Sequence, residues 1–494
     1  MIRNSTNSAT PTFLMPTFPT VSRTLLALAA SAAVLLSGCA GVRHDPLPAV
    51  PVPAQWSGTA APVSTAAAAG TATAPAPLMA PDFWRAFGDP VLDRLIADVL
   101  AANNDLAAAG IRVYRAQLQA GLADTNLTPG VTVQGNGQVS RTLDTHRMSR
   151  GSQLQVQVSY ELDLWGKLAA QRDAARWEAD ATDADREATR LSLISSTAGF
   201  YWQIGYLNEQ IAYAEANIAY AERTLALVRS RYAAGAVSGL DVAQTEQNLS
   251  QQRAAITQLV QQRTENRNAL AILFDRPPEQ SAPEPSALPA AALPVVPAGL
   301  PAELLSRRPD VRAAEWRLRG FLANADVTRT SFYPTFTLTG QAGTTSTNLS
   351  SALMNPVGSL GLGLALPFIQ WNTMQLQIKV SQTQFDEAVV LFRKTLYTAL
   401  GEVENALSAR EQLTREGEQR TLSLAQAQRA ETLARSRFLA GATGVQLWLD
   451  QQQRVRDAQS ADALVRLNRL NNRMALYKTL GGGGSASDVL PAAG

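Results

Sequence analysis

The sequence predicts a mixed α+β membrane protein in which each chain contributes four β-strands and two long helical hairpins. Three observations lead to this fold class. The chain repeats itself at a spacing of about 205 residues, so it contains two copies of one structural unit. Four segments alternate apolar with uncharged polar residues, as strands with one apolar face do. Two long segments place apolar residues at heptad spacing, which is typical of coiled-coil helices.

Residues 1–38 are predicted to be a lipoprotein signal peptide. Arg23 precedes a 13-residue apolar run that ends at Leu36, which is the length of a signal-peptide core and too short to span a bilayer. The run leads into Leu36-Ser37-Gly38-Cys39, which resembles a bacterial lipobox. Cys39 is the only cysteine and stands where a lipobox requires one, so we expect it to be acylated. Ala40 follows in place of the aspartate that often retains lipoproteins in the inner membrane, which favours the outer membrane.

Residues 39–80 are expected to form an acylated, flexible tether, because they are rich in Ala, Pro, Thr and Gly. The folded part begins near residue 81, and residues 485–494 form a tail. The sequence leaves open whether translation starts at Met1 or Met15, because the segment before the apolar run is long for a signal leader.

The internal repeat divides the folded part into two units. Asp105 and Asp310 stand 205 positions apart in matching surroundings, and Arg231 and Arg437 stand 206 apart. The first repeat is assigned to 81–275, a Pro-rich link to 276–301 and the second repeat to 302–484. The matching stretches are Arg231-Tyr232-Ala233-Ala234-Gly235 with Arg437-Phe438-Leu439-Ala440-Gly441, and Leu127-Thr128-Pro129 with Phe332-Tyr333-Pro334.

Each repeat is predicted to hold two strands, at about 131–140 and 152–164 in the first and at about 335–345 and 358–368 in the second. An ordinary β-sandwich is disfavoured, because four strands are too few and the face opposite the apolar stripe is uncharged. Four strands also cannot close a barrel, and lipid tolerates no open sheet edge. Three copies would supply a 12-stranded transmembrane barrel, wide enough for a wet pore. The clearest apolar stripes are Leu154, Val156, Val158, Tyr160, Leu162 and Leu164, and Leu360, Leu362, Leu364, Leu366 and Phe368.

Two long helices follow the strands. The first is predicted to run about 65 residues, or roughly 100 Å at 1.5 Å per residue, before a turn at 233–240 and a returning helix. The second repeat has the same order, with its turn at 439–446. A soluble helical bundle is disfavoured by the strands that lie between these helices. The heptad positions are Leu193, Thr197, Phe200, Ile204, Leu207, Ile211, Ala214, Ile218, Ala221, Leu225, Val228 and Tyr232.

Composition and motifs argue against several other classes of protein. A formal net charge of +2 leaves no basic footprint for nucleic acid. One cysteine allows no internal disulfide, and His44 and His146 lack neighbours for a zinc site. The chain contains no nucleophile elbow, phosphate-binding loop or zinc motif, so we predict no enzyme, no metal and no cofactor other than the lipid on Cys39.

Several stretches between residues 80 and 484 resemble the TolC-like outer-membrane efflux protein family, in particular its lipoprotein (NodT-type) branch serving RND pumps. The resemblance implies a homotrimer, with a 12-stranded β-barrel in the outer membrane continued by a 12-helix periplasmic α-barrel. It also implies a mixed equatorial region formed by the N-terminal helix, the link and the C-terminus. The stretches are Trp84-Arg85-Ala86-Phe87-Gly88-Asp89-Pro90, Asn103-Asn104-Asp105-Leu106, Tyr160-Glu161-Leu162-Asp163-Leu164-Trp165-Gly166, Arg231-Tyr232 with Leu240-Asp241-Val242, Arg307-Arg308-Pro309-Asp310-Val311, and Leu476-Tyr477-Lys478-Thr479-Leu480-Gly481.

The resemblance further implies a passive exit duct for drugs or other small molecules, which works with a periplasmic adaptor and an inner-membrane RND-type pump. An outer-membrane duct of a type I protein secretion system remains the alternative. A periplasmic adaptor protein would show one hairpin flanked by lipoyl-like β segments, which two hairpins and four strands contradict. The sequence identifies neither the exported compound nor the partner pump.

By the same resemblance, the periplasmic gate lies near the second turn. Asp450 matches an acidic residue of the family pattern, whereas Gln446 stands where relatives can carry Leu. Three aspartates around one axis would favour cations, but a solvated aspartate at a helix start would fit the same position. The gate candidates are Asp450, Leu449, Leu447 and Gln446; the candidates for hairpin tip and adaptor docking are Gly235, Ser238, Leu240, Asp241, Gly441 and Val445.

We predict that Cys39 is the first residue of the mature chain and carries lipid. Mass spectrometry of the purified protein should find the acylated N-terminus, and Cys39→Ser should weaken membrane targeting without abolishing transport, because the strands also hold the protein in the membrane. An unmodified Cys39, or cleavage at another position, would contradict the lipobox assignment.

Overall fold

The chain divides into two units, Met1–Pro46 and Leu47–Gly494, and the following description concerns the second. In this computed structural model the described residues are 51–53, 55–56, 81–278, 280, 282–290, 292–296, 307–346 and 356–482. The predicted signal peptide, Cys39, most of the tether and the tail lie outside them, so those assignments stay predictions.

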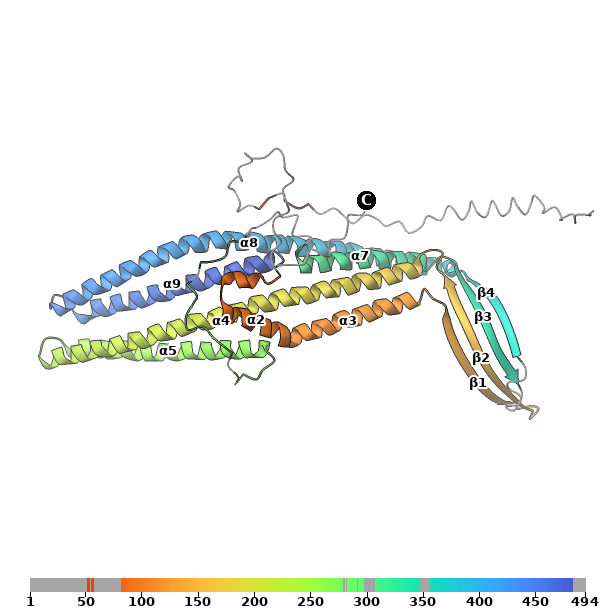
Figure 1. The fold of residues 1–494 in the computed structure, drawn as a ribbon, viewed down its shortest axis with the longest axis horizontal. Helices are drawn as coiled ribbons and strands as arrows, with labels where there is room; N and C mark the ends of the chain where they lie inside the picture. The colour runs from red at the N-terminus through yellow and green to blue at the C-terminus, as the bar shows by residue number, and fades with distance from the viewer. Residues whose placement is uncertain are drawn as a thin grey trace, which may run out of the picture. The chain divides into compact units, whose positions relative to one another are not determined.

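The order of elements repeats along the chain (Figure 1). Helices α3 and α7 both have 22 residues, strands β1 and β3 both have 12, and helices α5 and α9 both have 35, as two copies of one unit would. The first repeat contains η2 (Phe83–Phe87), α2 (Pro90–Ala102), α3 (Asn104–Thr125), β1 (Gly130–Arg141), β2 (Met148–Leu162), α4 (Lys167–Ala233) and α5 (Gly239–Leu273). The second contains α7 (Pro309–Thr330), β3 (Thr335–Ser346), β4 (Pro356–Ala365), η5 (Pro367–Ile369), α8 (Trp371–Leu439) and α9 (Val445–Thr479).

Two strands end earlier than the sequence predicts. Strand β2 stops at Leu162, because Asp163 leaves the sheet and its carboxylate accepts the N–H groups of Leu168 and Ala169 at the start of α4. Strand β4 stops at Ala365, because Pro367 has no N–H to continue the ladder and begins a short 3-10 helix instead. The predicted strand ends at 164 and 368 are therefore wrong by two and three residues.

The four strands form one antiparallel sheet in the order β1-β2-β3-β4. Residues directly opposite each other point to the same face, and the register therefore identifies both faces. Leu338 lies opposite Tyr160 and Leu362, within a row of apolar residues. Gln157 lies opposite Thr132 and Gln341, within a row of polar ones. The sheet thus has one continuous apolar face and one face of mainly Gln, Thr, Ser and Gly.

The long helices pack in two arrangements. Near the strands, α4 lies between α3 and α7, and α8 packs against α7. Toward the opposite end, α4 pairs with α5 and α8 pairs with α9, and these two hairpins meet through α4 and α9 (Figure 1). Burial follows the predicted heptad seam: Ile204, Leu207 and Val228 are fully buried, while Tyr232 at its end is exposed. None of the described helices is apolar over a length sufficient to cross a membrane.

The main core lies between these two arrangements. Phe87 of η2 packs against the fully buried Trp202, and Phe83 stacks on Tyr477 near the end of α9. Leu92 and Ile96 of α2 join them, so η2, α2, α4 and α9 share one apolar cluster. The link joins the same cluster through Val296 and Leu288. The N-terminal helix, the link and the C-terminal residues therefore come together, as the family resemblance implies for an equatorial region.

Equivalent residues of the two repeats tie this region together. The Asn103 side chain donates a hydrogen bond to the Leu273 carbonyl at the end of α5. Arg308, which stands 205 positions later, donates to the Thr479 carbonyl at the end of α9. The last residue of each returning helix is thus bound by the residue that precedes α3 or α7. This contact holds the ends of α5 and α9 at equivalent positions in the two repeats.

Candidate functional site

The two hairpin turns have the same backbone. Gly235 and Gly441 adopt φ values of 73° and 75°, in the left-handed region that favours glycine. In the first turn the Gly235 N–H donates to the Tyr232 carbonyl at 2.9 Å, and in the second the Gly441 N–H donates to the Phe438 carbonyl at 3.0 Å. Both predicted turn glycines are therefore required by the backbone, and the two tips are structural copies.

Asp241 links one tip to the other. Its carboxylate accepts hydrogen bonds from the Ser238 hydroxyl at 2.7 Å and the Ser238 N–H at 2.8 Å, which closes a capping box at the start of α5. The pKa of Asp241 lies below its usual value, chiefly because of these bonds from Ser238 and further because of a hydrogen bond from the Val445 N–H at the start of α9. A residue expected to start one helix thus also contacts the neighbouring hairpin.

An apolar cluster with a hydrogen-bonded centre joins the tips. Trp448 stacks on Phe438 with ring centroids 5.3 Å apart, and both side chains are buried. The Trp448 indole N–H donates to the Glu431 carboxylate at 2.7 Å, and the Tyr220 hydroxyl donates to the same oxygen at 2.8 Å. Tyr220 comes from the first hairpin and the other residues come from the second, so Glu431 connects the two.

The environment of Tyr220 affects its ionisation. Burial first, and then the hydrogen bond to Glu431, raise the pKa of Tyr220 from 10.0 to about 12. Because the folded-state pKa is raised, the associated stability is fully present below pH 10 and is lost as the pH rises toward 12. Tyr220 therefore stays protonated, and a hydrogen-bond donor to Glu431, at every physiological pH.

Arg231 makes the most direct contact between the hairpins. Its Nη1 donates to the Phe438 carbonyl at 2.8 Å, and its Nη2 donates to the Leu439 carbonyl at 2.7 Å. The guanidinium also lies 4.7 Å from the centroid of the Phe438 ring. One arginine thus caps the carboxyl end of α8 and stacks on an aromatic side chain there, both of which favour a cation.

The predicted gate residues lie in two different environments. Asp450 is exposed and accepts a hydrogen bond of 2.6 Å from the Gln446 amide one turn earlier on α9. Leu447 is 39% exposed, whereas Leu449 is buried in the cluster around Trp448. Asp450, Gln446 and Leu447 therefore have surface available to line a constriction, and Leu449 packs inside the tip.

The docking candidates also separate. Ser238 and Leu240 are exposed, so they can meet a partner. Val445 is fully buried beneath Trp448 and supports the tip instead of presenting a surface. Sequence reasoning missed Tyr220 and Glu431, which lie 211 positions apart and share no motif.

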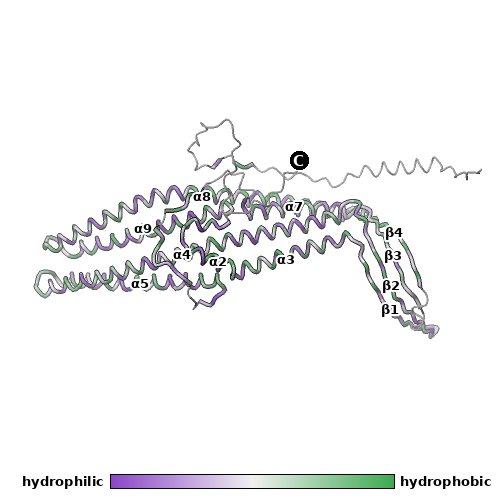
Figure 2. The backbone as a smooth tube through the Cα atoms, viewed as in Figure 1, coloured by the Kyte–Doolittle hydropathy of each residue, from purple (hydrophilic) through white to green (hydrophobic). Residues whose placement is uncertain are grey.

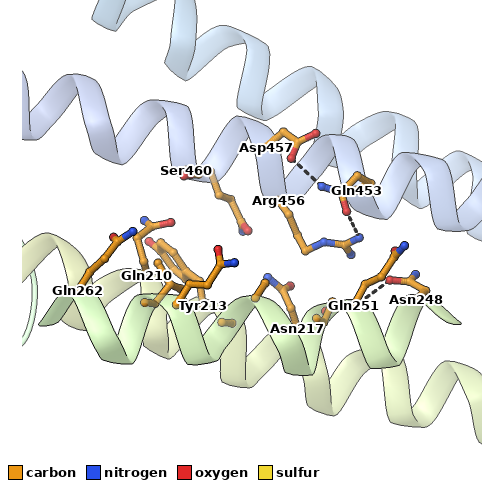
Figure 3. A pocket seen from close by; sticks show the side chains of 16 residues that line it. Gln210, Tyr213, Asn217, Asn248, Gln251, Gln262, Gln453, Arg456, Asp457 and Ser460 are labelled. Carbon is orange, nitrogen blue, oxygen red and sulfur yellow. Dashed lines mark hydrogen bonds between the residues drawn. The ribbon is translucent and has the colours of Figure 1, made fainter. Parts of the chain in front are cut away.

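A polar groove of about 380 Å³ separates the hairpins above the tips (Figure 3). It lies between α5 and α9 with α4 beside it, and amide side chains dominate its lining. A second hollow that includes Gln446 and Asp450 continues it toward the tips. At its other end, Arg466 of α9 pairs with Glu209 of α4 at 2.5 Å. The labelled lining residues are Gln210, Tyr213, Asn217, Asn248, Gln251, Gln262, Gln453, Arg456, Asp457 and Ser460.

The Glu209–Arg466 pair fixes the upper end of the groove. Burial alone would raise the pKa of Glu209, but hydrogen bonds from Arg466 and Tyr213 outweigh it and lower the pKa below its usual value. The hairpins are thus joined above and below the polar groove. Hydrophilic and hydrophobic residues alternate along the helices of both hairpins (Figure 2). Among the described residues, no group of His, Cys, Asp or Glu side chains could hold a metal ion.

Comparisons with known proteins agree with this arrangement. The family model for outer membrane efflux proteins matches residues 95–274 and 300–482. The pyoverdine export outer membrane protein OpmQ of Pseudomonas aeruginosa is 33% identical over 464 residues, which cover 91% of this chain and 95% of OpmQ. The toluene efflux pump outer membrane protein TtgC of Pseudomonas putida is 31% identical, with 94% and 96% covered. The open-state structure of the Neisseria gonorrhoeae outer membrane channel MtrE superposes with a TM-score of 0.77 at 28% identity, covering 90% of this chain and 98% of MtrE.

We predict that Glu431→Ala loosens the contact between the tips. The change leaves the Tyr220 hydroxyl and the Trp448 indole N–H without their acceptor, which costs ~1–3 kcal/mol. Hydrogen–deuterium exchange should therefore accelerate about tenfold or more in 220–242 and 431–449. Glu418→Ala is the matched control, because Glu418 lies exposed on the same helix with no side-chain partner among the described residues. Equal exchange in both variants would contradict the network.

Proposed function

Because the chain belongs to the outer membrane efflux protein family and is an efflux channel component, not an enzyme, we propose that three copies form the passive exit duct of a tripartite pump. The observation that carries the proposal is the sheet. Four strands have one mainly apolar face and one mainly uncharged polar face, and both outer edges lack a partner within the described chain. Such a sheet fits a barrel wall with lipid outside and water inside.

Closure by copies of the same chain follows from the edges. Strand β1 and strand β4 each have one unpaired row of backbone groups, and an edge exposed to lipid is too costly to persist. Pairing β4 of one copy with β1 of the next satisfies both rows. Three copies of four strands give 12 strands, and a barrel of that size can enclose a water-filled pore.

The helices support the same closure. Inside one chain, Trp316 of α7 packs against Ala181 and Ala184 of α4. The repeat equivalent of Trp316 is Ile111 of α3, which is exposed, and the first part of α8 exposes Val390 and Leu391. Packing α8 of one copy against α3 of the next therefore repeats the α4–α7 contact. The exposed apolar stripe on α3 is Ile111, Tyr114, Leu118 and Leu122.

The duct would be held in the outer membrane by the barrel and by lipid on Cys39, with the helices extending into the periplasm. A periplasmic adaptor would dock at the exposed tip residues Ser238 and Leu240, and an RND-type inner-membrane pump would supply the energy. Pyoverdine and toluene stand in the names of relatives. For this chain they support export of small molecules over the type I protein secretion alternative.

The gate would lie at the tips, where Asp450 is exposed beside the groove. Three copies of Asp450 around one axis would repel one another and attract cations. The Gln446 amide donates to this carboxylate, so each aspartate keeps a defined position on α9 while its charge stays available.

We predict that Leu362→Arg disrupts insertion, because it places a charge on the apolar face of β4. The cost should be about 2–4 kcal/mol at the bilayer midplane, and heat-stable trimers should decrease on gels. Thr337→Arg, on the polar face of β3, is the matched control and should fold and assemble. Comparable defects in both variants would show that the two faces are not lipid and lumen.

We predict that Asp450→Ala changes conductance and reduces cation preference in planar bilayers, whereas trimer stability stays near that of the parent because the side chain is exposed. Asp450→Arg should reverse the local selectivity, and block by trivalent cations from the periplasmic side should weaken in both variants. If conductance, selectivity and block all stay unchanged, Asp450 is only a helix-start residue.

A further inference from the structure

Arg231 and Arg437 occupy equivalent positions in the two repeats, 206 residues apart. Arg231 points from the first hairpin into the second and binds the carbonyls of Phe438 and Leu439. Arg437 is exposed, and its side chain has no hydrogen bond or ion pair within the described residues of one chain. The arginine of the first repeat therefore binds the other hairpin, whereas the equivalent arginine of the second repeat is exposed.

The carboxyl end of α4 has carbonyl groups and an aromatic ring in the same positions as those that bind Arg231 at the carboxyl end of α8. In both turns the third-last backbone positions accept matching hydrogen bonds: Ala236 N–H to the Arg231 carbonyl and Ala442 N–H to the Arg437 carbonyl, each at 2.9 Å. Tyr232 stands where Phe438 stands, and the residue is 53% exposed. Ala233 stands where Leu439 stands, and no hydrogen bond to its carbonyl is found in the described part of the chain.

We propose that Arg437 caps the carboxyl end of α4 in the neighbouring copy, with its guanidinium bound to the Tyr232 and Ala233 carbonyls and lying over the Tyr232 ring. The proposal rests on the ring of copies proposed above. In such a ring the second hairpin of one chain meets the first hairpin of the next, as the first meets the second inside a chain. The negative end of the α4 dipole and the face of an aromatic ring both attract a guanidinium.

The other tip contacts do not recur between copies. The repeat equivalent of Glu431 is Leu225, which cannot accept a hydrogen bond, and the equivalent of Asp241 is Leu447, which cannot cap a helix start. Val242 stands in the place of Trp448. The arginine and the aromatic residue that follows it are therefore the polar and ring partners kept in both repeats, and the proposed contact between copies depends on this pair.

The experiment is thiol cross-linking of the purified full-length protein with a short bis-maleimide. The test variant combines Arg437→Cys with Ala233→Cys. The matched control combines Arg231→Cys with Leu439→Cys, the equivalent pair inside one chain. The parent chain controls for Cys39, the only native cysteine.

The test variant should give a ladder of covalent dimers and trimers in denaturing gels, whereas the control pair should react at least fivefold more within a chain than between chains and the parent should give no ladder. Native mass measured before cross-linking separates the two proposals. A trimeric test variant that stays monomeric on the gel, while the control pair reacts, overturns the Arg437 contact. A monomeric native mass for the parent overturns the proposed ring of copies.

A second experiment tests the contact with the Tyr232 side chain. Adding Tyr232→Ala to Arg437→Lys and Arg437→Ala chains should lower the trimer's resistance to heat only in the Lys background, where a cation remains to meet the aromatic ring.

Discussion

The unpaired backbone at the two outer edges of the sheet is the constraint on which the rest of the structure depends. A sheet with one apolar face and two open edges is not a stable end state in lipid or in water. The duplication answers this constraint economically. Because β1 and β3 match in length and follow α3 and α7 of equal length, a second repeat can pair with the first, and a further copy can pair with the second by the same rule. Because α4 follows β2 and α8 follows β4, the order of the strands in the sheet also determines the order in which the long helices lie side by side.

This dependence of the helices on the strands explains the large size of the apolar core around Trp202. Helix α4 contacts α3 and α7 near the strands but α5 and α9 near the tips, so its neighbours change at the level of Trp202. Where the neighbours of α4 change, apolar side chains from α2, the link and the end of α9 fill the space between the helices. Gly205 marks how close this filling lies: a Cβ atom there would meet the ring of Pro285 at 2.8 Å. The hydrogen bonds from Asn103 and Arg308 hold the ends of α5 and α9 at the same level of the molecule, so both hairpins begin at this core.

Much of this fold could be predicted because its signals are local and periodic. The alternation in β2 and the heptads in α4 each depend on neighbours a few residues away, and the repeat adds an independent check. The errors occurred where a side chain overrode the periodicity: Asp163 left the alternation to cap α4, and Pro367 ended β4 although Leu366 and Phe368 continued the apolar stripe. The tip network was beyond the sequence for a different reason. Tyr220 and Glu431 come from different repeats, and neither has an equivalent in the other repeat that would have drawn attention to it.

This asymmetry between the repeats bears on how a ring of copies would open. Inside one chain the hairpins are held by the Trp448 cluster, Glu431, Asp241 and Arg231 at the tips, and by the Glu209–Arg466 pair above the groove. Between copies the proposed contact of Arg437 with the Tyr232 region would be retained, whereas the equivalents of Glu431, Asp241 and Trp448 would not. Separating two copies at the tips would therefore break fewer contacts than separating the two hairpins of a chain. The hairpins of one chain would then move as a unit, and the exposed surface of Asp450 would be carried with them. A single surface arginine per copy, bound to main-chain carbonyls instead of a carboxylate, would suit a contact that forms and breaks as the proposed ring opens and closes, because neither side would leave a buried charge behind.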